Sequence, residues 1–233
     1  MNTKKTIHII SGGTTSPIAT HLGLHARAFG KTGQTLASLC HYEMPELETV
    51  VHQTKMVTGG RDGERRGGTW YDGKLETNED VTRLVQSIKE DLGSKIVFMP
   101  VALCDFEVAS IDRWDVHATD VPPPDHIVPP EAQKFALASG KLTHQAPGKD
   151  AKRLSTHFDG HYTLRLKPAE KIIPTVRQGR KDIFLVGFKT TDGVDPDEQY
   201  IAGLNLLKEG SCNLVLANDV KTKLNMVITP EEA

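Results

Sequence analysis

Three neighbouring residues, Gly12, Gly13 and Thr14, have the types and the spacing to hold a phosphate group. Glycines leave their backbone N–H groups unobstructed and the threonine adds a hydroxyl, which are the donors that glycine-rich phosphate loops use. The dinucleotide fingerprint is not met, because no third glycine follows at the required spacing. The segment is therefore interpreted either as a phosphate-contacting loop or as a tight turn.

A second glycine cluster, Gly30-Lys31-Thr32-Gly33, resembles the end of a phosphate-binding loop. The upstream glycine of such a loop is missing, since position 25 is His. Taken alone, this cluster is also more typical of a turn than of a ligand site.

Polar and aromatic candidates stand at the ends of three later apolar runs: Asp105, Phe188 and the pair Asn218-Asp219. Asp105 has the chemistry to bind ribose, a base or a metal ion, or to cap the segment that follows it. The Asn-Asp pair suits either a ligand or a turn. Lys141 is a candidate for holding a phosphate, with a solvated surface lysine as the alternative. No HExxH pair, nucleophile elbow, Walker motif or kinase signature is complete.

Apolar runs and helical periodicity predict the elements that would position these residues. Strands are expected over residues 7–10, 50–57, 95–103, 183–188, 213–219 and 226–229. Helices are expected over residues 30–42, 77–88, 171–178 and 198–208. The second of these helices has the clearest signals, because Thr77 or Asn78 can cap it and Glu79 and Asp80 suit its positive end.

The alternation of strands and helices predicts an α/β fold with a doubly wound, Rossmann-like parallel sheet. Most of the strands are continuous apolar runs, as expected for a sheet covered on both faces. Ligands of such sheets bind at the carboxyl ends of the strands. The candidates at the strand ends are therefore expected to gather along one edge of the sheet.

A long extended excursion is expected over residues 108–133, because two proline runs interrupt every periodic pattern there. Residues 140–166 are predicted to form two strands joined by a polar turn. We expect residues 1–233 to form a single domain, with residues 108–166 as a lid or dimer arm.

The composition excludes several classes of protein. The chain has 233 residues, with 28 Lys and Arg against 30 Asp and Glu, and this net charge of −2 argues against a nucleic-acid-binding protein. The three cysteines lie in apolar runs without a CxxC pair, which favours reduced thiols. The first apolar run is too short for a signal peptide or a membrane span, so a cytoplasmic protein without membrane contact is expected.

Seven segments, taken in order, resemble the phosphopantothenoylcysteine synthetases, the synthetase half of the coenzyme A pathway flavoprotein family. The segments are residues 11–18, 30–33, 101–106, 140–142, 163–173, 185–188 and 216–220. They include counterparts of the family's glycine loop followed by Pro-Ile, its Val-Gly-Phe and its Ala-Asn-Asp-Val. The flavin-binding decarboxylase half of the bifunctional members has no counterpart, so no flavin is expected.

This resemblance implies a reaction in coenzyme A biosynthesis. A nucleoside triphosphate, CTP or ATP, with Mg²⁺ would activate the carboxylate of 4′-phosphopantothenate as an acyl nucleotide and release pyrophosphate. The amine of cysteine would then attack, giving an amide and the nucleoside monophosphate. The family works as a homodimer, and the excursion after residue 108 would serve in that dimer.

The resemblance also assigns roles to residues. Lys141 would stabilise charge at the reacting phosphate, as the catalytic residue. Nucleotide contacts would come from Gly12, Gly13, Thr14, Asp105, Lys141, Lys171, Ile172, Ile173, Phe188 and Lys208. Substrate contacts would come from His25, Arg27, Gly30, Asn218 and Asp219.

One position departs from the family. Ala26 takes the place of the asparagine that contacts the acyl intermediate, when residues are counted without gaps, and His25 or Arg27 is a candidate substitute. Losing one transition-state donor typically lowers a rate about a hundred- to a thousandfold. A nucleotide-binding homologue that has lost this site, or uses another acid, is therefore the alternative function. A Rossmann-type reductase is a third hypothesis.

Overall fold

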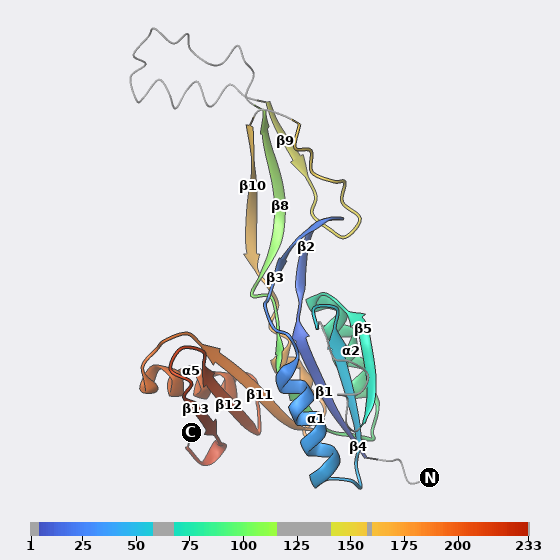
Figure 1. Cartoon of the computed structure of the whole chain (residues 1–233), viewed down its shortest axis with the longest axis vertical. Coiled ribbons are helices and arrows are strands. Elements are labelled where there is room, and N and C mark those ends of the chain that lie inside the picture. The colour runs from blue at the N-terminus through green and yellow to red at the C-terminus, as the bar shows by residue number, and fades with distance from the viewer. Residues whose placement is uncertain (1–4, 58–67, 116–140, 158–159, 233) are drawn as a thin grey trace. The chain divides into compact units, whose positions relative to one another are not determined.

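A computed structural model describes residues 5–57, 68–115, 141–157 and 160–232 of the chain (Figure 1). The chain divides into two compact units, which we describe separately. The first comprises residues 1–15, 25–104 and 170–233, and the second comprises residues 16–24 and 105–169. The prediction of one domain with a lid or dimer arm at residues 108–166 stays a prediction.

The first unit is built on one mostly parallel sheet with the order β13-β12-β11-β6-β1-β4-β5. Its strands are β1 (Thr6–Gly13), β4 (Glu48–Thr54), β5 (Thr69–Leu75), β6 (Ser94–Met99), β11 (Phe184–Thr191), β12 (Leu214–Asp219) and β13 (Asn225–Ile228). The short β7 (Val101–Ala102) also pairs with β1. Only β13 is antiparallel to its neighbour among these pairings.

Numbered in chain order, the seven strands of this sheet lie in the order 7-6-5-4-1-2-3. The order reverses between β1 and β6, which is the topological switch point of a Rossmann-like sheet. The fold class predicted from the sequence is confirmed.

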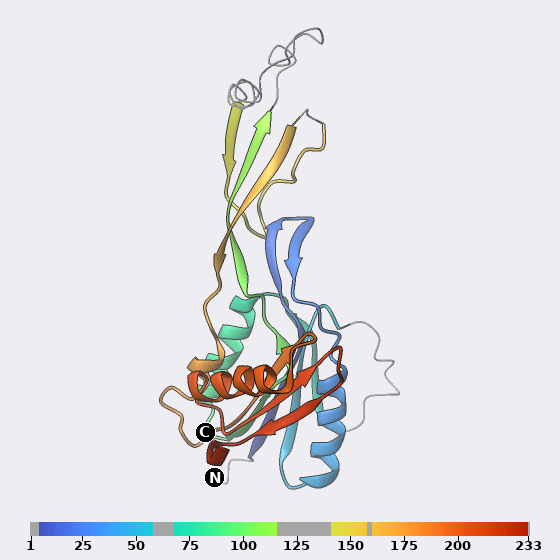
Figure 2. The ribbon, with the colours of Figure 1, turned by 90° about the vertical axis from the view of Figure 1, so that its left-hand side faces the viewer.

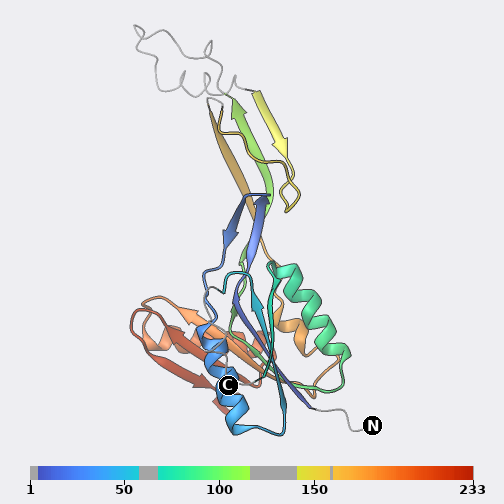
Figure 3. The same cartoon turned by 45° about the vertical axis from the view of Figure 1, so that its right-hand side comes forward.

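Helices cover both faces of this sheet (Figures 2 and 3). They are α1 (Lys31–Glu43), α2 (Asn78–Glu90), the short α4 (Ile173–Val176) and α5 (Pro196–Glu209). Side chains alternate along β1, so Ile7 and Ile9 pack with Ala37 of α1, whereas Ile10 packs in the cluster that includes Val85 of α2. The alternation therefore produces one core on each side of the sheet.

α2 forms where its capping signals predict. The Thr77 side chain accepts a hydrogen bond from the Asp80 N–H, and the Asp80 carboxylate accepts one from the Thr77 N–H at 2.9 Å. This is a capping box, which satisfies two of the otherwise unpaired donors of the first turn. Val81, Val85 and Ile88 are buried at helical spacing.

The second unit contains a three-stranded antiparallel sheet, ordered β10-β8-β9. Its strands are β8 (Phe106–Asp115), β9 (Lys141–Gln145) and β10 (Gly160–Pro168). A two-stranded ribbon, β2 (Thr15–Ala19) and β3 (Leu22–His25), contributes Ile18 to a small core with Ile111 and Leu154.

The structure corrects several expectations. Residues 106–115, expected to be irregular from residue 108, form β8, because β9 and β10 hydrogen-bond to its two edges. For the same reason β9 and β10 are not a hairpin: each pairs with β8 rather than with the other. Residues 116–133 of the expected excursion lie outside the described residues.

Further corrections concern the ends of elements. Gly12 and Gly13 continue β1 instead of forming a loop, since they pair with β7. Phe188 does not end its strand, because β11 runs to Thr191. The helix expected over residues 171–178 is only the four-residue α4. β2, β3 and β5 were not predicted. In the described part of the chain, no helix is long and apolar enough to cross a membrane.

Candidate functional site

The carboxyl end of β1 lies at the switch point of the sheet, and two glycines there allow unusually close backbone packing. Gly12 has φ 99°, and a Cβ built on it would overlap the Thr54 side chain. A Cβ on Gly13 would overlap the backbone oxygen of Ala26. Only glycine fits at either position, so these residues bring β1, the end of β4 and the segment around Ala26 together.

Thr14 stabilises this arrangement through hydrogen bonds of its buried side chain. Its side chain is buried, and its hydroxyl donates to Asn78 Oδ1 at 2.7 Å while accepting from the Cys104 N–H at 2.9 Å. Asn78 in turn donates its amide to the Cys104 carbonyl at 2.8 Å. Thr14 therefore joins the end of β1 to the start of α2 and to the segment after β7, as an internal hydrogen-bonding residue.

The segment that carries the predicted substrate residues runs beside this end of β1. The Ala26 N–H donates to the Thr14 carbonyl at 2.9 Å, and His25 Nδ1 lies 2.8 Å from the Thr15 hydroxyl. Arg27 is exposed. The first unit thus brings together six of the predicted site residues: Gly12, Gly13, Thr14, His25, Arg27 and Gly30.

The N-terminus of α1 completes this group. Gly30 is its N-cap with φ 76°, and no side chain caps the helix. The first turn holds no acidic residue, and Lys31 is exposed at its start. Helix N-termini attract anions through their free N–H groups and the helix dipole. Arg27 lies in the segment just before this helix. The free N–H groups of α1 and the charge of Arg27 therefore give this end of β1 the donors and the positive charge that suit a phosphate group.

Asn218 and Asp219 are placed at the carboxyl end of β12. Asp219 is buried, and its carboxylate accepts from the backbone N–H groups of Thr222 at 2.8 Å and Gly193 at 2.7 Å, as well as from the Thr191 hydroxyl at 2.9 Å. These bonds, led by that of Thr222, hold the pKa of Asp219 well below its usual range. Of the two interpretations given for the Asn-Asp pair, a ligand contact or a turn, Asp219 therefore fits the turn. Asn218 accepts from the Thr190 hydroxyl at 3.1 Å.

The other predicted nucleotide residues of the first unit are spread over two helices and a strand. Ile172 is buried in the main core with Ile173 packed against it, and Lys171 before them is exposed. Phe188 is half-buried within β11. Lys208 lies in the last turn of α5. Since α5 leads into the amino end of β12, Lys208 is not brought to the carboxyl edge of the sheet.

Asp105 and Lys141 belong to the second unit. Asp105 is exposed, and its carbonyl accepts a hydrogen bond from the Ala169 N–H at 2.9 Å. Lys141 begins β9, where it is the register partner of Asp115 in β8. The roles assigned to these two residues stay predictions.

Metal and thiol chemistry find little support in the described residues. No group of three or more His, Cys, Asp or Glu side chains there could hold a metal ion. Cys40, Cys104 and Cys212 are free and buried, as predicted. Burial raises the pKa of Cys212 to about 11, so this thiol is protonated at neutral pH.

Asn78 is the residue of this site that sequence analysis missed in part. It was noted as a possible helix cap, whereas its side chain joins Thr14 and Cys104 across 64 and 26 residues of chain. Its place directly after the capping threonine was the only local signal.

The strand order and the helices on both faces define a Rossmann-like α/β fold that is shared with solved structures named for pantothenate metabolism and for coenzyme A biosynthesis. A DNA/pantothenate metabolism flavoprotein from Streptococcus pneumoniae superposes with a TM-score of 0.64 at 17% identity, over 98% of this chain and 93% of that chain. The C-terminal domain of the coenzyme A biosynthesis bifunctional protein CoaBC gives 0.61 at 13% identity, over 99% and 85%.

A third solved structure is a Cab2 mutant in complex with phosphopantothenate-cysteine. It gives a TM-score of 0.61 at 15% identity, over 98% of this chain and 77% of that chain. No family model matches the sequence, and no curated protein sequence is significantly similar to it. The resemblance to phosphopantothenoylcysteine synthetases, inferred from short motifs, is thereby confirmed at the level of the fold.

Proposed function

We propose that this chain is a nucleoside-triphosphate-dependent ligase that joins 4′-phosphopantothenate to cysteine. The observation that carries the proposal is the carboxyl end of β1, where Gly12, Gly13, Arg27 and the uncapped N-terminus of α1 meet at the switch point. The fold around it is shared, over nearly the whole chain, with structures named for pantothenate metabolism and for coenzyme A biosynthesis.

The proposed reaction has two steps. A carboxylate oxygen of the acid attacks the α-phosphorus of CTP or ATP, so that a P–O bond forms and pyrophosphate leaves. The cysteine nitrogen then attacks the carbonyl carbon of this acyl nucleotide, the nucleoside monophosphate leaves, and the nitrogen loses a proton. Mg²⁺ bound to the triphosphate would offset its charge.

Residues of the first unit have distinct tasks in this proposal. Donors at the start of α1 and the Arg27 guanidinium hold phosphate oxygens, and His25, positioned by Thr15, faces the acid. Thr14 and Asn78 keep the end of β1 in place. Lys141 and Asp105 act on the nucleotide, as the sequence resemblance implies, in a homodimer.

The direct test is product formation. The full chain is incubated with phosphopantothenate, cysteine, Mg²⁺ and either CTP or ATP, and the products are followed by mass spectrometry. The proposal predicts the amide together with CMP or AMP. Nucleotide binding without turnover would instead favour the alternative, a nucleotide-binding homologue, and NAD(P)H binding would favour the reductase.

Ala26 is the observation that favours this alternative, and it provides a sharper test. Its N–H is engaged by Thr14, and its methyl group has no hydrogen bond to offer. We predict that Ala26→Asn raises the rate of amide formation at least tenfold if the site uses the family's acid, because a transition-state donor is restored. Ala28→Asn, two residues along the same segment, is the matched control and leaves the rate unchanged. An equal effect of both changes would contradict the assignment of position 26.

A further inference from the structure

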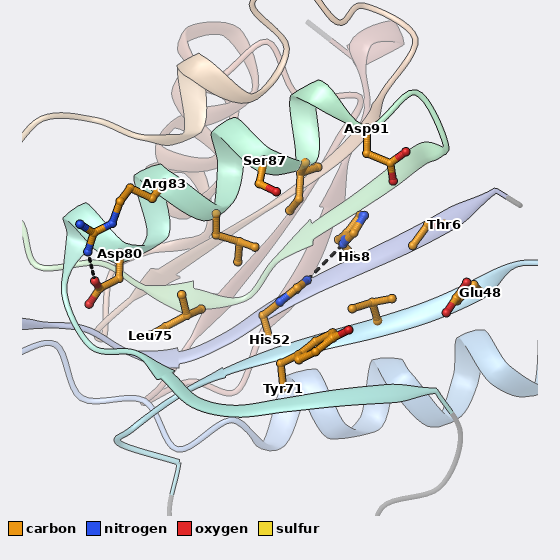
Figure 4. Close-up of a pocket in the computed structure, with 13 residues that line it drawn as sticks. Thr6, His8, Glu48, His52, Tyr71, Leu75, Asp80, Arg83, Ser87 and Asp91 are labelled. Carbon is orange, nitrogen blue, oxygen red and sulfur yellow. Dashed lines mark hydrogen bonds and ion pairs between the residues drawn. The ribbon is translucent and has the colours of Figure 1, made fainter. Parts of the chain in front are cut away.

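A pocket of about 630 Å³ opens between α2 and the face of the sheet that α2 covers (Figure 4). Its floor comes from β1, β4 and β5, and its other wall comes from α2 and the residue Asp91 that follows it. The pocket lies within the first unit and shares no residue with the site at the end of β1. Its volume lies within the range of small-molecule sites, about 300–1,000 Å³.

Three rings from adjacent strands form the middle of this floor. His8, His52 and Tyr71 stack in a row, with centroid distances of 5.4 and 5.5 Å and interplanar angles of 19° and 13°. His8 is buried, whereas Tyr71 is 44% exposed at the other end of the row. The row therefore leads from the interior to the mouth of the pocket.

Aliphatic side chains complete the lining around the rings. Val50 and Leu75 come from the sheet, and Leu84 and Ile88 come from α2. Leu84 packs against the core that contains Leu75 and Ile88. A ligand in the pocket would therefore bury apolar surface on both sides, and an aromatic ligand would in addition meet the rings in the offset or edge-to-face arrangements that aromatic pairs prefer.

Burial keeps the two imidazoles of the floor neutral. It lowers the pKa of His8 to about 4, although Asp91 and Glu48 raise it, and it lowers the pKa of His52 to about 3, with His8 acting in the same direction. Either nitrogen of a neutral imidazole can carry the proton, and a contact with the ring is available in both forms. At pH 7 the two imidazoles therefore add no charge to the floor.

The charged side chains of the pocket lie at its two ends and are engaged within the protein (Figure 4). Asp80 forms an ion pair with Arg83 at one end. At the other end the Arg180 guanidinium lies beside Asp91, and Glu48 is not free either. A charged ligand would have to compete with these existing interactions, whereas a neutral ligand between the two ends would leave them intact.

We propose that this pocket is a second binding site, which takes a neutral, flat aromatic molecule. The ligand would lie between α2 and the row of rings, in contact with His52 and Tyr71 on one side and with Leu84 on the other. The site is independent of the proposed ligase reaction, so either proposal stands if the other fails.

The test uses 2-naphthol, a flat aromatic molecule that is neutral at pH 7, as the probe. The full chain, labelled with ¹⁵N in its histidine rings, is titrated with it at this pH. We expect the ring signals of His8 and His52 to shift saturably, because both rings line the pocket. The ring signal of His41, at an exposed position of α1, stays in place.

Three analogues separate the contribution of the aromatic ring from that of the missing charge. Decahydro-2-naphthol has the same carbon skeleton without an aromatic ring, and we expect it to bind about fivefold more weakly or worse, because the ring contacts are lost. Naphthalene-2-carboxylate and 2-naphthylmethylamine carry opposite charges at pH 7. Both bind at least about tenfold more weakly than 2-naphthol, because a charge buried without a partner is unfavourable.

Two pairs of matched variants locate the site, and all of them change exposed residues. Ser87→Trp fills the pocket from α2 and abolishes binding, whereas Gln86→Trp, at the neighbouring position outside the lining, leaves it unchanged. Tyr71→Leu removes the outermost ring of the row and weakens binding about threefold or more, whereas Tyr71→Phe keeps the ring and binds within about twofold of the wild type.

Four results would overturn the proposal: no saturable shift at millimolar 2-naphthol, equal binding of decahydro-2-naphthol, equal or tighter binding of a charged analogue, or equal affinity of the Ser87 and Gln86 variants. Equal weakening by Tyr71→Leu and Tyr71→Phe would also contradict it, because the ring of Tyr71 would then not be the contact.

Discussion

At the scale of single residues, the glycines of β1 act through the space they leave. An alanine methyl at position 13 would overlap the Ala26 backbone oxygen, and backbone cannot turn away as a flexible side chain can. The proposed phosphate contacts depend on this packing, since it places Arg27 and the start of α1 beside the strand end.

We predict that Gly13→Ala lowers the free energy of unfolding by about 2 kcal/mol or more, as overpacking typically does, and also weakens nucleotide binding. Gly179→Ala is the control: its φ of 76° strains an alanine by about 1–2 kcal/mol, but nothing lies within 4 Å of the added methyl. Urea unfolding and nucleotide titration measure both effects. Unchanged nucleotide affinity in a folded Gly13→Ala protein would contradict this role.

His8 and His52 give the stability a specific pH dependence. Their pKa values in the folded chain, about 4 and about 3, lie below the ordinary value of 6.5. The unfolded chain therefore binds more protons than the native one between roughly pH 6.5 and 4. Their contribution to stability is complete above pH 6.5 and is lost as the pH falls through this window. The charged groups around them are Glu48 of β4, Asp80 and Arg83 of α2, and Asp91 with the Arg180 guanidinium beside it, and Tyr71 of β5 lies against His52.

We predict that the wild-type chain loses on the order of 2 kcal/mol per histidine between pH 7 and 5. His52→Phe, which keeps the stack, loses correspondingly less over the same interval. Denaturant unfolding at several pH values measures this difference. Parallel pH profiles of the two proteins would show that His52 is not buried in its neutral form.

Sequence analysis found residues whose type alone is informative and missed those defined by distant partners. Gly12 and Gly13 stand out as a pair of glycines after an apolar run. Thr14 was noted for its hydroxyl, but its partners lie 64 and 90 residues away, so its internal role had no local signal. The His8–His52 contact spans 44 residues and was missed for the same reason.

At the scale of elements, α2 matters because its first residue is part of the site. Asn78 holds Thr14 and Cys104 only if the helix begins at the correct residue. The capping box of Thr77 and Asp80 fixes that start. Burial alone would raise the pKa of Asp80, but hydrogen bonds from Thr77, Glu76 and Arg83 lower it well below its usual range.

We predict that Thr77→Ala costs about 1 kcal/mol of stability, the usual effect of losing a cap, and that it also weakens nucleotide binding. Thr82→Ala, on the exposed side of the same helix, changes stability by less than about 0.5 kcal/mol and leaves binding unchanged. Thermal unfolding and nucleotide titration separate the two variants. Identical results for both threonines would show that the capping box contributes nothing specific to stability or to nucleotide binding.

Elements were predictable where burial dictates the sequence. The strands of the central sheet are continuous apolar runs, and the helices carry caps and apolar stripes, so most were placed within a few residues. β9 and β10 were predicted as strands within residues 140–166, but their pairing with β8 was not. β3 and β8 carry no strong pattern of their own, because their pairing partners rather than a large core define them.

At the scale of the whole molecule, the doubly wound, Rossmann-like class of the sheet followed from the alternation of elements and was confirmed, whereas the order of its strands comes from the structure. The chemistry is less predictable, because a Rossmann-like fold serves many reactions and the activity resides in particular residues. Here the end of β1 has the donors for a triphosphate, while Ala26 lacks the donor that the family uses. We propose that this chain carries out the acyl-nucleotide reaction in spite of that difference.

The most direct test follows the oxygen atoms of that reaction. Phosphopantothenate labelled with ¹⁸O in its carboxylate is incubated with the chain, cysteine, Mg²⁺ and CTP or ATP. We predict that one ¹⁸O atom appears in the nucleoside monophosphate and none in pyrophosphate, because the acid oxygen attacks the α-phosphorus and leaves with it. Label in inorganic phosphate, or an unlabelled nucleotide with no amide formed, would contradict it.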